Sequence, residues 1–354
     1  MTTEGTTTVR TSEEVLADYT GVEELAVQPD PEHAALARQV RELISERQLG
    51  ATSARTTVVH LVLAWGGAIG AGIVGVVVNE RAVWVVVWLA IAAVFAGNAT
   101  LNHEAAHGHL FASRRWNKVV GTVALLPILG SYATYRCFHL EHHARTAREG
   151  DPERTPLNFP SRLLYVAALV LGGALVIVEN TSYTVMTVLG HPPKWVRTAR
   201  QRRAIRLNAL YLLGVVALIV VGLVFDTSVV INVWLIPYVI GVCVYLPLFL
   251  LPEHYGATGE GDILDNTRNV ASNALVRWVF WNNNFHAAHH LAPVVPFDKL
   301  AQVDRLLEAA GTVAPIWRLR SYTQFHWGTL THLAFNRPRG EKTGSPEPSA
   351  ASPA

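Results

Sequence analysis

The sequence predicts an all-α fold: a polytopic membrane protein with two transmembrane helical hairpins and a cytoplasmic, histidine-rich helical cap. Half of the 354 residues are hydrophobic and only 16% are charged, which favours membrane spans over several soluble domains. Four apolar stretches each approach the ~20 residues that a helix needs to cross a ~30 Å hydrocarbon core. They lie at about 56–78, 82–102, 207–225 and 229–251.

The two ends of the chain differ from this apolar centre. Residues 1 to about 30 lack an apolar signal segment, and we expect a flexible cytoplasmic tail. Residues 31–48 carry apolar side chains at helical spacing and predict an amphipathic helix, either on the membrane surface or packed as a soluble helix. We expect a tail with this helix over 1–54, a membrane domain over 55–335, and a disordered tail over 336–354.

Short polar links pair the four spans into hairpins. One link is Asn79–Arg81 and the other is Asp226–Ser228. Basic residues gather at the opposite ends of the hairpins, at Arg114–Lys118 and at Lys194–Arg206. By the positive-inside rule these ends face the cytoplasm, so the protein is expected to be multi-pass, with both termini on that side.

Two further apolar segments do not fit as spans. Residues 119–130 are too short, and residues 163–189 are interrupted by the polar run Glu179–Ser182. A full crossing at 163–189 would put the histidines before and after it on opposite membrane faces. We therefore expect this segment to be re-entrant or interfacial.

Charge and cysteine content exclude other classes of function. A formal net charge of +2 gives no reason to expect a nucleic-acid partner. The two cysteines, Cys137 and Cys243, form neither a C-x-x-C pair nor a disulfide framework. A metal site must therefore use other ligands.

Nine of the fifteen histidines lie in four short segments at the cytoplasmic ends of the predicted spans. Positions i, i+3 and i+4 share one face of a helix, so each cluster directs two or three imidazoles the same way. Nine imidazoles exceed what one tetrahedral zinc ion can use, and they suit two metal ions with open positions. The predicted metal ligands are His103, His107, His139, His142, His143, His254, His286, His289 and His290.

Two rival functions also use such residues. The run from His103 to His107 has the form H-E-x-x-H, in which a metalloprotease binds zinc and uses the glutamate as general base. A protease would leave the two H-x-x-H-H clusters unexplained. A metal transporter needs polar ligands inside its spans, whereas these histidines lie at the span ends.

In this pattern the chain resembles the integral-membrane fatty acid desaturase and hydroxylase superfamily, with its boxes of the forms H-x-x-x-H, H-x-x-H-H and H-x-x-H-H. The resemblance covers about residues 56–310, and Asn284–Leu291 resembles the third box. The run Glu253–Gly256 is similar to one in membrane alkane monooxygenases, which implies that His254 joins the metal ligands.

The resemblance implies two ferrous ions, O2, and a hydrophobic lipid or acyl substrate. The expected reaction is desaturation, with hydroxylation of an acyl chain, alkane or terpenoid as the alternative. The His254 element favours hydroxylation, whereas Gly150–Glu153 after the second box favours an acyl desaturase. An external electron donor is also implied, of the ferredoxin or cytochrome b5 type with its reductase. The cluster Lys194–Arg206 could dock an acidic donor, but anionic lipid explains its charge better.

Ligating imidazoles usually donate their second N–H to a neighbouring group. We expect Glu104, Glu141 and Glu253 to accept such hydrogen bonds, because each is next to a clustered histidine in sequence. Asp262 and Asp265 are further candidates for this role. Asn282–Asn284 could support or ligate a metal, or form a turn or helix cap before the third histidine cluster. His109 is expected not to be a ligand.

Overall fold

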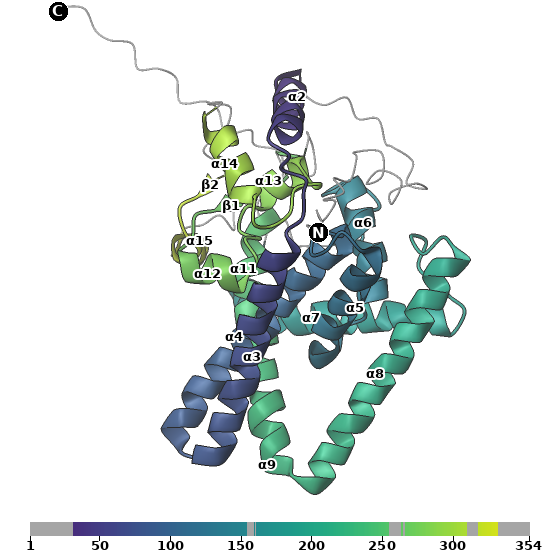
Figure 1. Ribbon diagram of the computed structural model, residues 1–354, viewed down its shortest axis with the longest axis vertical. Helices are drawn as coiled ribbons and strands as arrows, with labels where there is room; N and C mark the ends of the chain where they lie inside the picture. Colours follow the sequence, from purple (N-terminus) through teal and green to yellow (C-terminus); the bar gives the residue numbers. More distant parts are fainter. Residues whose placement is uncertain are drawn as a thin grey trace, which may run out of the picture.

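The computed structural model describes residues 31–153, 159, 161–254, 263–264, 266–309 and 318–331. Nearly all of its regular structure in these residues is helical, as the sequence predicts (Figure 1). The predicted N-terminal tail (1–30) and C-terminal tail (336–354) lie outside the described residues. Five helical segments are long and apolar enough to cross a membrane, one more than the four predicted.

The first hairpin consists of α3 (Ala54–Val78) and α4 (Arg81–His107). Asn79 ends α3 in the left-handed conformation, and its side chain accepts a hydrogen bond from the indole of Trp84. The same indole packs so tightly on Gly75 that an added Cβ would lie 2.7 Å from the ring, which explains the glycine. Helix α4 continues past the predicted end of its span, so the first histidine cluster forms its last turns.

The second hairpin begins with α8 (Ala199–Phe225) and turns at Asp226, whose side chain accepts a hydrogen bond from the Val229 N–H. Its second arm is a continuous run over 227–254 that alternates α and π geometry. The turns of both hairpins lie at the lower end of Figure 1, away from the histidine clusters. In order, the arm comprises α9 (Thr227–Val230), η2 (Ile231–Leu235), α10 (Ile236–Tyr238), η3 (Val239–Tyr245) and α11 (Leu246–His254).

The additional candidate span is α7 (Arg162–Val188), the segment expected not to cross. Near its start, Tyr165 contacts His326, which in turn bonds the Leu248 carbonyl of α11. Near its end, Thr184 bonds Thr134 of α6 at 2.6 Å. Leu248 and Thr134 each lie within about 10 Å, along their helices, of a clustered histidine. Both ends of α7 are thus held near the clustered histidines. A helix whose two ends lie on the same side of the membrane does not cross it, so this favours an interfacial position, although the length of α7 alone permits a crossing.

A small cap covers the histidine clusters at the upper end of Figure 1. Here the predicted amphipathic helix is present as α2, and its Val40 is buried with residues of α13 and α14. The packed soluble alternative therefore fits better than a helix resting on the membrane surface. The cap is built from α2 (Pro31–Glu46), α13 (His286–Leu291), α14 (Leu300–Ala309) and a parallel pair of strands, β1 (Asn269–Val270) and β2 (Arg318–Leu319).

Four shorter helical elements complete the described fold. They are α5 (Arg114–Leu125), α6 (Tyr132–Arg145), α12 (Ala274–Val279) and α15 (Tyr322–Thr331), with a 3-10 turn, η1 (Leu126–Ile128), between α5 and α6. Residues 119–130 accordingly form a short helix and turn, in agreement with the prediction that they do not span. Helix α6 carries the second histidine cluster between the two hairpins.

Candidate metal centre

The structure brings all nine predicted histidines together in two groups, each with its ligand atoms within 4.8 Å of one another. The first group is His103, His107, His139, His143 and His289. The second group is His142, His254, His286 and His290. Helices α6 and α13 contribute to both groups, because adjacent histidines such as His142 and His143 point to different sides of the helix.

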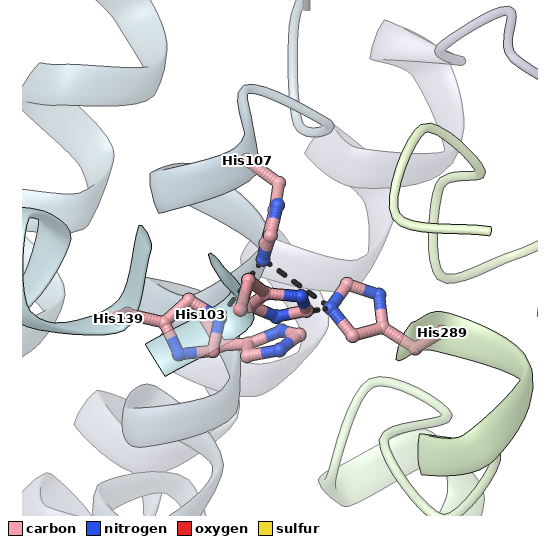
Figure 2. Close-up of side chains that lie close together, drawn as sticks. His103, His107, His139 and His289 are labelled. Atoms are coloured by element: carbon pink, nitrogen blue, oxygen red, sulfur yellow. Dashed lines mark hydrogen bonds between the residues drawn. The ribbon is translucent and has the colours of Figure 1, made fainter. Parts of the chain in front are cut away.

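In the first group, histidines from α4, α6 and α13 converge on a common point (Figure 2). The Nε2 atom of His107 lies 2.8 Å from that of His139 and 3.2 Å from that of His289. The Nε2 atom of His289 also lies 3.2 Å from that of His143. The Nε2 atom of His103 is buried with no hydrogen-bond partner among the described residues.

The second group shows the same arrangement with one residue from the end of α11. The Nε2 atom of His286 lies 2.9 Å from that of His254 and 3.0 Å from that of His290. The Nε2 atom of His142 is buried without a hydrogen-bond partner in the described part of the chain. Every member of this group is buried.

These separations fit metal ions better than hydrogen bonds. An imidazole nitrogen offers either one hydrogen or one lone pair, so the Nε2 atom of His289 or His286 cannot bond both of its Nε2 neighbours. Nitrogens bound at ~2.1 Å to one ion lie about 3.0–3.4 Å apart in octahedral or tetrahedral geometry. The separations of 2.8–3.2 Å in the first group and 2.9–3.0 Å in the second are close to that range. Two imidazole-bound cations would satisfy the nitrogens that hydrogen bonds leave without partners.

Burial favours the form of histidine that binds metals. It lowers the pKa of His139 and His143 in α6, and neighbouring imidazoles lower it further. The same two causes lower the pKa of His286 and His290 in α13. Imidazole coordinates a metal in its neutral form, so these side chains carry the required lone pair.

Glu104 occupies the position predicted for it beside the first group. It is 1% exposed, and its two oxygens lie 3.0 Å from the His103 Nδ1 and 3.1 Å from the His109 Nδ1. It also accepts a hydrogen bond from the Phe297 N–H. These contacts orient His103 with its Nε2 toward the group. The Glu104 carboxylate bonds His103, His109 and the Phe297 N–H, whereas the general base of an H-E-x-x-H protease must be free to take a proton from water. His109 belongs to neither group.

The second group has partners of its own. Glu253, a predicted partner, lies 3.7 Å from the His286 Nδ1 and accepts a hydrogen bond from Asn283. The Nδ1–H of His254 donates to the Asn266 carbonyl at 2.8 Å, which leaves its Nε2 lone pair for the group. This carbonyl lies twelve residues beyond the histidine in sequence, and no residue type signals it.

Asp151 was missed by sequence reasoning as a partner. Both of its oxygens lie 3.0 Å from the His142 Nδ1, and its carboxylate also accepts from the Ala147 and Glu153 N–H groups. Burial lowers the pKa of His142, but the charges of Glu153 and Asp151 outweigh it and raise the pKa. The sequence signal for this contact is the acidic run Gly150–Glu153, which begins eight residues after His142 along the chain but does not show which acid faces it.

Several predicted supporting residues have other roles. Glu141 accepts hydrogen bonds from Arg145 and Arg197 and bonds no box histidine among the described residues, because it lies on the other side of α6. Asn282 and Asn284 bond the carbonyls of Phe297 and Val270, and they form the turn before α13 without capping it. Asp262 and Asp265 lie outside the described residues.

The chain matches the fatty acid desaturase family over residues 82–320, more than half of its length, and this range contains all nine histidines. It is also similar to the dihydrorhizobitoxine desaturase of Bradyrhizobium elkanii, with 27% identity over 242 residues. That alignment covers 62% of this chain and 66% of the relative, so the chain spans slightly less than two thirds of the relative's length. With its apolar helices and two histidine groups, this integral membrane protein belongs to the fatty acid desaturase family.

Proposed function

We propose that this protein is an O2-dependent di-iron oxidase whose nine clustered histidines hold two iron ions. One observation carries the proposal: the nine histidines divide into two buried groups of five and four, each compact enough for one ion. Imidazole is a suitable ligand for iron, and the family match favours iron over zinc or copper. When bound as a pair, ferrous ions supply the reduction of O2 needed to attack an unactivated C–H bond.

The protein's own residues would orient and enclose that chemistry. Glu104 and Asp151 lie 3.0 Å from the Nδ1 atoms of His103 and His142, which directs the opposite nitrogens inward. Glu253 lies 3.7 Å from the Nδ1 atom of His286, beyond hydrogen-bond distance. The ring of Tyr135 stacks on His139 at 5.2 Å and adds an apolar wall beside the first group. Burial of both histidine groups limits the access of bulk water to the ions that they would hold.

Desaturation of a lipid or acyl chain is the favoured reaction. The family and the name of the relative both support removal of two hydrogens. Hydroxylation of an acyl chain, alkane or terpenoid is the second candidate, because His254 of the alkane-monooxygenase-like element lies within the second group. The two outcomes differ only in whether a second hydrogen leaves or an oxygen is returned to carbon, which small displacements of the substrate decide.

Electrons for this reaction come, in this proposal, from a separate ferredoxin or cytochrome b5 with its reductase. The basic cluster beginning at Lys194 contributes to a surface hollow of about 460 Å³ at the end of α6. Four basic residues and two acidic ones line it, so basic side chains prevail: Arg145, Arg148, Lys194 and Arg197 against Glu141 and Glu149. This charge suits either an acidic donor or anionic lipid, and it accords with a cytoplasmic position of the histidine face.

Turnover of the purified protein tests this proposal. The protein is reconstituted in lipid vesicles with ferredoxin, ferredoxin reductase and NADPH, and the lipids and added acyl substrates are then analysed by mass spectrometry. O2 consumption with a product two hydrogens lighter supports the desaturase, and a product one oxygen heavier supports the hydroxylase. Zinc-loaded protein that consumes no O2 under these conditions would contradict both.

A further inference from the structure

Helix α11, which carries His254 at its end, contains a proline, Pro252, two residues before that end. In an α-helix the N–H of each residue donates to the carbonyl four residues earlier, and proline has no N–H. Pro252 therefore leaves the Leu248 carbonyl without its usual helical donor. Such a group inside a membrane segment has no water to bond and needs a partner from a neighbouring helix.

His326 of α15 supplies that partner. Its Nε2 lies 2.8 Å from the Leu248 carbonyl oxygen, and a carbonyl accepts only, so Nε2 carries the hydrogen. The Nδ1 atom then holds a lone pair and accepts from the hydroxyl of Tyr165 of α7 at 2.5 Å. Tyr165 is fully buried and His326 is 9% exposed. One imidazole thus connects α7, α11 and α15 and is fixed in a single tautomer.

The connection ends close to the second histidine group. Leu248 lies six residues before His254, about 9 Å along the helix. The last turn of α11 also holds Glu253, beside His286, and the His254 Nε2 lies 2.9 Å from that of His286. His326 itself belongs to neither group. Its direct contact with the helix that carries His254 is made through the backbone of α11.

We infer that His326 is a positioning residue: by bonding the carbonyl freed at Pro252, it holds the last turn of α11 so that His254 meets the second histidine group. The backbone part of this inference is independent of the reaction. The consequence for metal binding rests on the proposed function.

Amide hydrogen exchange of the full-length protein in nanodiscs tests the backbone part. His326→Ala leaves a buried carbonyl without a donor, so the amides of Leu251, Glu253 and His254 should exchange about tenfold faster. His326→Gln, whose side-chain amide can donate to the same oxygen, should keep exchange near the wild-type rate. His191→Ala, at an exposed histidine of the α7–α8 connection, is the matched control and should change nothing.

A second substitution tests the reason for the effect. Pro252→Ala returns an N–H that can donate to the Leu248 carbonyl, so the double variant His326→Ala/Pro252→Ala should recover most of the lost protection. Unchanged exchange in His326→Ala, or a double variant as fast as His326→Ala alone, would overturn the inference.

Metal content gives a separate readout. His326→Ala should lower the iron per chain from two toward one, with little change in thermal midpoint, and the double variant should regain the second iron. Equal loss of both irons with a lower midpoint would mean a general structural role and would overturn the positioning role. A wild-type protein that takes up no iron counts against the proposed function, whereas the exchange rates still decide the backbone part.

Discussion

The two histidine groups differ in how their side chains are held. Four of the five members of the first group lie on α4 or α6, with His107 as the last residue of α4, and Glu104 orients one of them. In the second group, two of the four members lie on the six-residue helix α13, and His254 is the last residue of α11. Each member of the second group has an outer contact: Asp151 for His142, the Asn266 carbonyl for His254, Glu253 for His286 and Thr146 for His290.

This difference indicates which contacts fix the positions of the histidine side chains in each group. A long helix fixes its side chains through its own backbone and packing, whereas a helix as short as α13 is marginal alone. The second group therefore depends on side-chain and carbonyl contacts from outside its helices. We expect substitutions around it to act on one group, and substitutions in shared elements to act on both.

Removal of a ligand should have the largest effect. His289→Ala takes a nitrogen from the first group that lies 3.2 Å from both His107 and His143. We expect the iron content to fall from two toward one and turnover to fall by more than about 100-fold, beyond the usual range for outer contacts. Iron analysis and O2 consumption measure these losses, and normal turnover would remove His289 from the ligands.

Asp151→Asn should affect the second group alone. The substitution keeps the shape of the side chain but removes the charge beside the His142 Nδ1. We expect metal binding in that group to weaken about tenfold, at the lower end of the range for such contacts, with the first group unchanged. Competition with a chromophoric chelator resolves the two affinities, and equal weakening of both would contradict the comparison.

Asn269→Ala should affect both groups moderately. Asn269 accepts hydrogen bonds from the Ala287 and Ala288 N–H groups at the start of α13 and donates to Asp304. Loss of this cap costs about 1 kcal/mol, or roughly a fivefold loosening of α13, which serves both groups. The same chelator titration should show similar weakening at both sites. An effect on one site only would show that α13 does not move as a unit.

Glu141→Gln should have the smallest effect. Glu141 bonds Arg145 and Arg197, whose side chains are 21% and 32% exposed, and such partly solvated pairs contribute about 1 kcal/mol or less. Turnover should stay within about twofold of the wild type and the thermal midpoint should fall by a few degrees at most. A tenfold loss of turnover would mean that Glu141 supports a histidine after all.

The sequence predicts those parts of the structure that depend on regular spacing along the chain. Apolar runs gave the two hairpins, and the i, i+3, i+4 spacing indicated which histidines share a helix. Helical spacing does not show which histidines of α6 belong to which group, and His142 and His143 belong to different groups. That division depends on how α6 is rotated between its neighbours, which is a tertiary property.

The outer contacts were harder to predict, because adjacency in sequence is a poor guide to them. Glu104 does contact its neighbour His103, whereas Glu141 points away from its own neighbours. Asp151 approaches His142 from a turn nine residues later. The position of α7 was likewise argued from the need for one shared site, since its length and composition alone permit a crossing.

In the proposed function, nine histidines hold two iron ions in two separate groups. Metal analysis of protein purified after iron-replete expression is the decisive experiment, with His289→Ala and His290→Ala as a pair that removes one nitrogen from each group. We expect two irons per chain in the wild type and about one in each variant. One iron or none in the wild type, or two in both variants, would contradict it.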